Sequence, residues 1–353
     1  MIRLYNELSS FEKQSDTWKE LVTSSVGATA FQSFLYFKIS WEHFRSPGDK
    51  PYVLFCYKKN GAELCAIMPC VLSKDGTLSF LNESNTDFCD IIVDAKSCSD
   101  YHIYEEIADY IQADSDVRRM CFKNIPAQSP LLAFLRYFFK GSIVSSEAGY
   151  SLVKVIAGQR EDLFKCLPAL NTKERYRLKN VDKKATNVRT EIVSAEQTAF
   201  PEEVRKIIGE MIAAKMREAS YFSEDFISFL QTLYEGGMLH IALTKSAEDA
   251  VAASLLIPDL KEKNTYIQWI AIYKEKAHNL WNVLGVLKQL CEQGGGELNF
   301  ARGWYPYKVH NFRPQLENLY TFRYAKGYWG QIKNIASLNF YLLKQIAKQI
   351  LRK

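Results

Sequence analysis

The stretch at residues 296–308 restricts the folds open to this chain more than any other segment. It follows residues 279–291, where leucines and a valine recur on one helix face, and the glycines at 294–296, which end that helix. Residues 297–301 then alternate polar and apolar side chains, as a strand does, and Pro306 stiffens the turn that comes next. Helix, glycine stop, strand and rigid polar turn is the order in which α/β enzymes present reactive groups at a strand end.

Three short motifs of this chain resemble motifs of one known family. The first is Asn-Phe-Ala-Arg-Gly at 299–303, followed by Pro-Tyr-Lys at 306–308 and by Phe312. The others are Ala-Phe-Gln-Ser at 30–33 and Asp-Phe-Cys-Asp at 87–90. Together they resemble the motifs of GNAT-fold acetyltransferases of the CelD type. That family is related to the FemAB aminoacyltransferases and is associated with bacterial exopolysaccharide production.

The second half of the chain has the element order of a GNAT-like domain. Its periodicities predict a strand, two helices at 201–218 and 226–234, three antiparallel strands, a helix, a strand, a turn and a final strand at 320–323. The first half shows a looser version of this series. We therefore expect an α/β (α+β) fold of two GNAT-like domains, with mixed, mostly antiparallel sheets flanked by helices. The N-terminal domain is placed at 1–148, the C-terminal domain with the site at 149–328, and a basic helix at 329–353.

Composition limits the classes of protein to which this chain can belong. With 353 residues, 47% hydrophobic and 24% charged, it fits two soluble domains, each large enough for its own core. The net charge of +5 is small for this length, so an electrostatic partner must bind a local patch. The eight cysteines never form a Cys-x-x-Cys pair, and no secretion signal or membrane span is visible. We therefore expect a cytoplasmic protein with reduced cysteines and no metal.

Two acidic residues, Asp87 and Asp90, stand just before the apolar strand 91–93. Two carboxylates at the mouth of a strand could orient an acceptor or act as a base, so both are candidate substrate-binding residues. The alternative is that they are solvated loop and capping groups.

The most basic segment of the chain, 173–189, is predicted to be helical in part. Arg175 and Lys179 lie one turn apart on the same face, where they could hold a phosphate or an acidic glycan. The segment resembles the family's Arg-x-x-Leu-Arg stretch, and Lys215 falls where the family often carries a basic residue. The alternative is a helix face in contact with water.

The C-terminal segment 326–353 contains lysines and arginines and no acidic residue. Apolar side chains recur at helical spacing between the basic ones, which predicts an amphipathic helix. Such a helix could lie on an anionic membrane surface, or it could pack its apolar stripe on the domain and leave its lysines in water. Both arrangements stay open. In the first, the C-terminal helix would bring the protein into peripheral contact with a membrane.

The polar turn indicates the chemistry. Acyl transfer needs a proton for the leaving group, stabilisation of an oxyanion and an oriented acceptor. We expect Tyr307 to donate the proton and Lys308 or Arg302 to stabilise the developing negative charge. Asn299 would orient the acceptor, although the family usually has an acid at this position. The alternatives are an ion pair for Arg302 and core packing for the tyrosines. Further predicted substrate contacts are Gln268, Trp304 and Tyr305.

Donor binding is predicted where strand 265–273 meets helix 279–291. The resemblance implies acetyl-CoA or another acyl-CoA, whose pyrophosphate many GNAT enzymes hold with a glycine-rich loop at a helix N-terminus. The junction here has no glycine, so Lys274, Lys276 and Asn279 would supply the donor contacts instead. An aminoacyl-tRNA donor, as in FemAB proteins, stays open.

Three functions fit these observations. The first is transfer of an acyl group to an amino or hydroxyl group of a sugar, nucleotide sugar or glycan in bacterial surface polysaccharide biosynthesis. The second is aminoacyl transfer from charged tRNA, which the basic segment 173–189 would also suit. The third is a non-catalytic scaffold beside a membrane glycan machinery. No serine-hydrolase, nucleotide-hydrolase or zinc-protease motif is present in the sequence.

Overall fold

The computed structural model describes residues 1–58, 61, 63–327, 330–332, 335–336 and 339–340. Contacts divide the chain into an N-terminal unit, Met1–Glu147 with Asn318–Lys353, and a central unit, Ala148–Glu317. The first boundary lies next to the predicted one. The second differs, because residues from 318 onwards belong to the N-terminal unit. The helix predicted at 329–353 lies largely outside the described residues and stays a prediction.

The N-terminal unit is built on a mixed sheet. Its strands are β1 (Ile2–Tyr5), β2 (Lys50–Tyr57), β3 (Leu64–Leu72), β4 (Thr77–Phe80), β5 (Ile92–Val93), β6 (Arg119–Pro126) and the C-terminal part of β13 (Gln315–Ala325). They lie in the order β1-β2-β3-β4-β6-β13, with β5 paired to β3. Only the β4–β6 pair is parallel among the strand pairs described in this unit.

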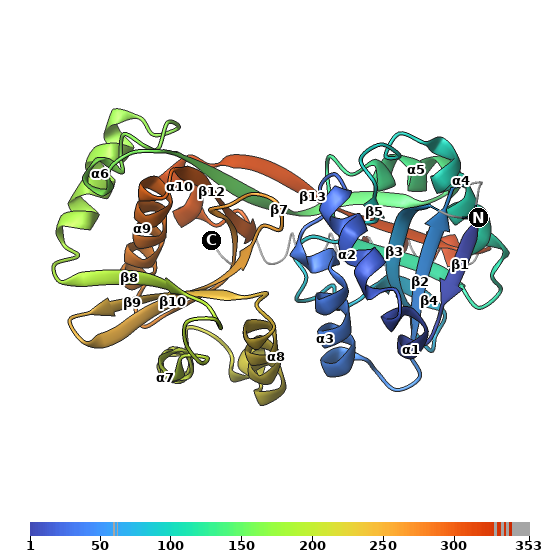
Figure 1. Cartoon of the computed structure of the whole chain (residues 1–353), viewed down its shortest axis with the longest axis horizontal. Coiled ribbons are helices and arrows are strands. Elements are labelled where there is room, and N and C mark those ends of the chain that lie inside the picture. Colours follow the sequence, from blue (N-terminus) through green and yellow to red (C-terminus); the bar gives the residue numbers. More distant parts are fainter. Residues whose placement is uncertain (59–60, 62, 328–329, 333–334, 337–338, 341–353) are drawn as a thin grey trace. The chain divides into compact units, whose positions relative to one another are not determined.

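Helices cover both faces of this sheet (Figure 1). They are α1 (Leu8–Glu12), α2 (Ser15–Ser24), α3 (Phe34–Phe44), α4 (Tyr101–Ala113) and α5 (Pro130–Phe138). Successive side chains of β2 point to opposite faces: Val53 and Phe55 join the core with α1 to α3, while Leu54 and Cys56 join the core with α4 and α5. A strand buried on both faces reads as a continuous apolar run, which is why residues 51–57 do.

The central unit has the same kind of architecture. Its strands are β7 (Ile143–Ile156), β8 (Val188–Val193), β9 (His240–Ser246), β10 (Asp249–Pro258), β11 (Thr265–Tyr273) and β12 (Gly295–Arg302). They lie in the order β7-β12-β11-β10-β9-β8, antiparallel throughout except for the parallel pair β11–β12. The helices are α6 (Thr172–Lys183), α7 (Glu202–Ala213), α8 (Glu224–Glu235), α9 (Lys276–Glu292) and α10 (Pro306–Phe312). Figure 1 shows α9 on one side of β8–β10 and α7 with α8 on the other. The mixed α/β class predicted from the sequence is confirmed.

Two predicted elements of the central unit differ in the structure. The bend predicted after Gly303 is a short helix, α10, because Pro306 occupies its first position, where a missing N–H costs nothing. The helix predicted at 201–218 ends at Ala213, and Lys215 after it has a left-handed backbone with φ 53°.

Helix α9 packs unusually close to the sheet. A Cβ at Gly285 would lie 2.1 Å from Thr190 Oγ1 and 2.4 Å from Thr190 Cβ, so only glycine fits this approach to β8. Gly209, in contrast, lies on the exposed face of α7 with nothing within 4 Å of an added Cβ.

This difference gives a matched pair of substitutions. We expect Gly285→Ala to lower the free energy of unfolding by about 1–3 kcal/mol, because helix and strand must move apart. Gly209→Ala should instead raise it by about 0.5–1 kcal/mol, since alanine is the better helix former. Urea unfolding of both variants measures the difference, and an unchanged Gly285→Ala variant would contradict the described packing of α9.

Candidate active site

The strands β11 and β12 separate part-way along their length. Their registered pairs run from Thr265–Glu297 to Ile267–Asn299, and both strands continue beyond this point, to Tyr273 and Arg302. On its other side β11 pairs with β10, where Leu255 faces Ile270 and Leu256 faces Gln268. Trp269 is therefore the extra residue of a bulge, which bends β11 where it leaves β12. This break in the backbone pairing of two parallel strands, inside the central unit, is called the opening between β11 and β12 below.

Helix α9 begins just beyond the end of β11. Lys276 is its first residue, and the N-cap residue Glu275 makes no side-chain cap hydrogen bond within the described range 63–327. The first turn contains no acidic side chain. The His278 N–H donates to the Glu275 carbonyl oxygen at 3.0 Å, so the amides that stay available to an anion are those of Lys276 and Ala277, where the helix dipole also favours negative charge. Lys276 itself is exposed, as the prediction for a donor-binding residue requires.

Tyr307 and Asn279 meet at this end of the opening. Asn279, in the first turn of α9, is buried, and its side chain forms a hydrogen bond with Tyr307 of α10. Burial raises the pKa of Tyr307 to about 12, against the opposing effect of that hydrogen bond. The Tyr305 ring is stacked on Tyr307, with ring centroids 6.3 Å apart. The phenol therefore stays protonated at physiological pH and can donate a hydrogen bond or a proton, but it is a poor base.

Lys308 occupies a different environment from Tyr307. Its side chain is buried, and Nζ donates to the carbonyl oxygen of Phe300 at 2.5 Å and to that of Gly303 at 3.5 Å. The ammonium also lies 4.9 Å from the centre of the Tyr305 ring. Lys308 therefore ties the end of β12 to α10, and these contacts favour a structural role over the predicted contact with developing charge.

Three other predicted residues hold the end of β12 in place. Asn299 Oδ1 accepts a hydrogen bond from the Ala301 backbone N–H at 2.9 Å, which supports the left-handed φ of 54° at Ala301. Trp304 donates from Nε1 to the Tyr150 carbonyl oxygen at 2.9 Å, although its ring is half exposed. Arg302 lies opposite Tyr150 in β7 and is partly exposed.

Gln268 lies where the strands begin to separate, and it is nearly fully buried. Its Nε2 donates to Ser254 Oγ at 2.5 Å, but Oε1 accepts no hydrogen bond from any described residue. Ser254 in turn donates to Asn282 of α9, whose Nδ2 donates to the Ala242 carbonyl oxygen at 2.7 Å and to Thr244 Oγ1 at 2.9 Å. The network fixes the Gln268 amide and leaves one buried acceptor for a ligand donor.

The sequence analysis missed Ser254 and Asn282. Asn282 was visible as a polar residue within the apolar face of the predicted helix 279–291, and Ser254 as a polar residue within an apolar strand. Neither signal reveals a partner, because the network joins α9 to β10 and β9 across the sheet.

The predicted basic residues do not gather at one point. Lys274 makes ion pairs with Glu210 at 3.0 Å and Asp249 at 2.7 Å, so its charge is already neutralised. Lys215 is exposed after the end of α7. Arg175 and Lys179 both lie on α6, but Lys179 is exposed, while Arg175 Nε is buried and donates to no described residue.

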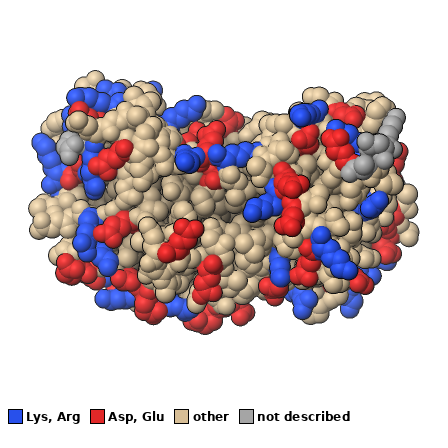
Figure 2. Space-filling view, viewed as in Figure 1, with Lys and Arg blue, Asp and Glu red and all other residues tan. Residues whose placement is uncertain are grey.

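A basic groove runs between α6 and α10. Arg177 donates to the His310 carbonyl oxygen, and Arg313 lies 3.8 Å from Glu174. Asn171 and Lys173 line the same groove. Figure 2 shows Lys and Arg side chains gathered over α6, with few acidic ones between them.

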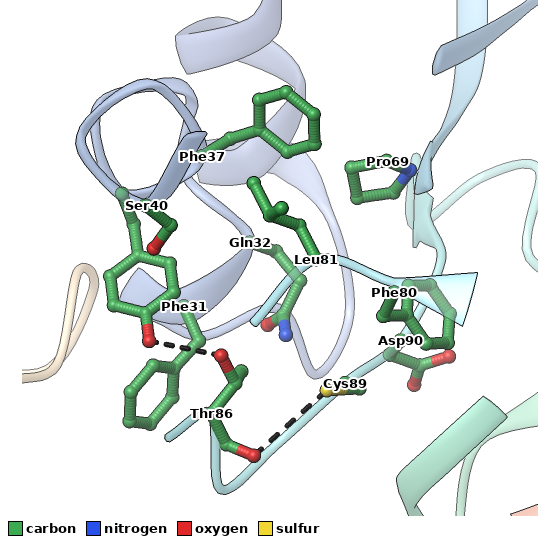
Figure 3. A pocket seen from close by; sticks show the side chains of 11 residues that line it. Phe31, Gln32, Phe37, Ser40, Pro69, Phe80, Leu81, Thr86, Cys89 and Asp90 are labelled. Carbon is green, nitrogen blue, oxygen red and sulfur yellow. Dashed lines mark hydrogen bonds between the residues drawn. The ribbon is translucent and has the colours of Figure 1, made fainter. Parts of the chain in front are cut away.

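Asp87 and Asp90 lie in the N-terminal unit. Their exposed fractions are 5% and 8%, so the alternative of solvated loop groups was wrong. Asp90 also borders a small cavity of this unit (Figure 3).

Among the residues that the structure describes, no group of three or more His, Cys, Asp and Glu side chains is arranged to hold a metal ion. Of the helices that are described, none is both long and apolar enough to span a bilayer.

No protein-family model and no curated protein matches this sequence. Several solved structures are similar to it. FemX has a TM-score of 0.59 at 10% identity, over 88% of this chain and 96% of its own. A C-terminal domain assigned to a lysylphosphatidylglycerol synthetase of Agrobacterium fabrum gives 0.58 at 12% identity, over 89% and 92%. L-PGS from Bacillus licheniformis gives 0.56 at 14% identity, also over 89% and 92%.

This likeness covers nearly the whole chain and establishes the fold. The predicted fold class, two GNAT-like domains with helices on mostly antiparallel sheets, is confirmed. At 10–14% identity this likeness concerns the fold alone. The resemblance to the CelD type in particular stays a prediction.

Proposed function

We propose that this chain is an acyltransferase whose acyl donor binds in the opening between β11 and β12. The observation that carries the proposal is the separation of these strands beyond Ile267–Asn299, with the α9 N-terminus and Tyr307 just beyond it. Acyl transfer needs such a combination: space for an extended donor, a site for its anionic end, and a proton donor at the leaving group. Gln268 Oε1 adds a buried acceptor that could hold an N–H of the donor or the acceptor.

The geometry supports a simple reaction sequence. The amine or hydroxyl of the acceptor forms a bond to the acyl carbon, and the bond from that carbon to the leaving group then breaks. Tyr307 gives its proton to the departing atom and takes the proton that the acceptor loses, so the phenol is unchanged after one turnover. Asn279 holds the hydroxyl in position for both transfers.

For the donor we propose acetyl-CoA or another acyl-CoA, with its phosphates at the α9 N-terminus. If so, Lys276→Glu should weaken acyl-CoA binding about tenfold at low salt, because it places a negative charge where the phosphates bind. Calorimetric titration measures this, with Lys263→Glu in the exposed β10–β11 loop as control. Equal dissociation constants for the Lys276 variant and the wild type would contradict this placement.

For the acceptor we propose an amino or hydroxyl group of a sugar, nucleotide sugar or glycan intermediate in bacterial surface polysaccharide biosynthesis. This part rests on the sequence resemblance to the CelD type. The test is transfer of label from acetyl-CoA to nucleotide-sugar pools, with free hydrolysis subtracted. Absence of turnover, together with absence of calorimetric binding of any acyl-CoA, would contradict the proposal.

A second candidate is aminoacyl transfer from charged tRNA, as in FemAB proteins. Three observations favour it: the β11–α9 junction has no glycine, Lys274 is neutralised by two carboxylates, and the groove between α6 and α10 is basic. Binding of aminoacyl-tRNA that weakens steeply as salt rises would support this candidate. Binding that is absent or insensitive to salt would argue against it.

A further inference from the structure

Two cysteines that are far apart in the sequence meet in the core of the central unit. Cys291 lies in the last turn of α9, and Cys166 lies in the connection between β7 and α6, 125 positions earlier in the chain. Their Sγ atoms are 2.7 Å apart, which is shorter than the van der Waals contact of two unbonded sulfur atoms. A disulfide has an S–S distance of about 2.05 Å, so the pair is less than about 1 Å from bonding distance.

The backbone around both cysteines is held by one short segment at the end of β7. The Ile156 N–H donates to the Cys166 carbonyl oxygen at 2.9 Å, and the Gly158 N–H donates to the Cys291 carbonyl oxygen at 3.1 Å. A Cβ at Gly158 would overlap Cys166 Sγ and lie 3.3 Å from Cys291 Sγ, so only glycine leaves room for the two sulfur atoms. The segment 156–158 therefore fixes the two cysteines relative to each other.

The surroundings of the pair suit a disulfide. Cys166 is 3% exposed and Cys291 is 0% exposed, and both belong to the core cluster that includes Leu163, Leu167 and Leu290. Apart from its contact with the other sulfur, Cys291 Sγ lies 3.5 Å from the Gln159 carbonyl oxygen, and a thiol is only a weak donor. Loss of the two thiol hydrogens therefore breaks no strong hydrogen bond in this core.

A second pair of cysteines, Cys56 and Cys65, comes close across β2 and β3 of the N-terminal unit. The Cys65 thiol donates to the Cys56 carbonyl oxygen at 3.1 Å. These residues are nine positions apart, so a bond between them would close a short loop within one hairpin. Such a loop restricts the unfolded chain less than a loop of 125 positions does, and thermal stability therefore distinguishes the two pairs.

We propose that Cys166 and Cys291 are a site of reversible oxidation, at which a disulfide ties the C-terminal end of α9 to the connection between β7 and α6. The oxidant is a small-molecule disulfide, with oxidised glutathione as the probe. In the described state both residues are free thiols. The proposal does not rest on the proposed acyl transfer, since it concerns only the covalent state and the stability of the central unit.

The covalent step is a double thiol–disulfide exchange. The thiolate of one cysteine bonds to a sulfur of oxidised glutathione, whose S–S bond breaks and releases the first glutathione thiolate. The thiolate of the other cysteine then bonds to the protein sulfur of this mixed disulfide and releases the second glutathione thiolate. The two glutathione thiolates take up the two protons that the cysteines lost, so the protein pair is oxidised and glutathione is reduced.

The rate of this exchange depends on local opening of the core. Burial raises the pKa of the Cys291 thiol to about 12, so few thiolates form while the structure is closed. Exchange then proceeds through transient openings of the end of α9. The test must therefore run until the fraction of disulfide no longer changes.

The test is incubation of the full chain with excess oxidised glutathione at pH 8, followed by alkylation of the remaining thiols, tryptic digestion without reduction, and mass spectrometry. Trypsin places the two cysteines in separate peptides, 166–173 and 289–302, each with a single cysteine. We expect these two peptides to be linked, and to separate after treatment with dithiothreitol. The oxidised chain should also unfold about 5–10 °C higher than the reduced chain, because the bond closes a long loop.

The variants Cys291→Ala and Cys70→Ala form a matched pair, since each removes one buried thiol from one of the two units. Cys291→Ala should lose both the linked peptides and the rise in melting temperature on oxidation, and Cys70→Ala should keep both. The wild-type comparison of oxidised and reduced chain decides even if Cys291→Ala does not fold, and Cys166→Ala then replaces that variant.

Three results would overturn the proposal. The first is absence of linked peptides 166–173 and 289–302 once exchange has reached equilibrium. The second is a linked chain that melts no higher than the reduced one. The third is a rise in melting temperature that persists in Cys291→Ala, because it would come from another pair such as Cys56 and Cys65.

Discussion

Tyr307→Phe is expected to lower kcat by at least about 100-fold, with a much smaller change in KM. The phenol is the proton donor in the proposed reaction, and loss of a positioned acid costs about 10²–10⁴ in rate. Phenylalanine keeps the ring that stacks on Tyr305 and removes only the hydroxyl that bonds to Asn279. Steady-state kinetics with the labelled donor measure both constants.

The control for this substitution is Tyr137→Phe, the same change at an exposed tyrosine of α5 in the N-terminal unit. It should change kcat by less than about threefold. Because the pKa of Tyr307 is raised to about 12, the wild-type rate should show no loss from ionisation of this phenol up to pH 10. A Tyr307→Phe variant with unchanged kcat would remove the catalytic role. An intact cellular phenotype together with no turnover would favour the scaffold interpretation.

Lys308→Met is expected to lower the free energy of unfolding by about 2–4 kcal/mol. Methionine fills the same space but leaves the carbonyl oxygens of Phe300 and Gly303 without their shared donor, and buried acceptors without donors cost about 1–3 kcal/mol each. The end of β12 and the start of α10 should lose their mutual orientation, so activity should fall as well. Chemical denaturation followed by intrinsic fluorescence measures the stability.

The same variant separates structure from catalysis at Lys308. If the contacts with Phe300 and Gly303 are its main role, loss of activity should accompany loss of stability, and Lys263→Met in an exposed loop should change neither. A Lys308→Met variant that is as stable as the wild type, yet inactive, would restore the catalytic role first inferred from the sequence.

The resemblance predicted site residues within 299–308, and in the structure these residues lie in different environments. Tyr307 meets the α9 N-terminus, but the Lys308 ammonium faces backbone carbonyls five and eight positions earlier in the chain. Neighbours in sequence point in different directions on a helix, and a predicted turn does not reveal this. The predicted turn is the helix α10, so the Tyr307 phenol, the Lys308 ammonium and the Arg302 guanidinium do not share one environment.

The basic residues show the same limit. A run of lysines and arginines indicates a positively charged segment, but it does not show which charges are neutralised by distant carboxylates. Lys274 is held by Glu210 and Asp249, which are 64 and 25 positions away in the chain, so it is a poor candidate for a phosphate contact. Lys276, two positions later, is exposed at the helix start and stays a candidate.

The sequence by itself determined the α/β class and the kind and order of most helices and strands, because helical and strand periodicities are local properties of the chain. Only the tertiary structure decided that β13 returns to the N-terminal unit and that Asp87 and Asp90 are buried. It also decided that β11 leaves β12 beside an unpartnered Gln268 oxygen. These features depend on contacts between residues far apart in the chain, where strand pairing and burial are settled by packing rather than by local spacing.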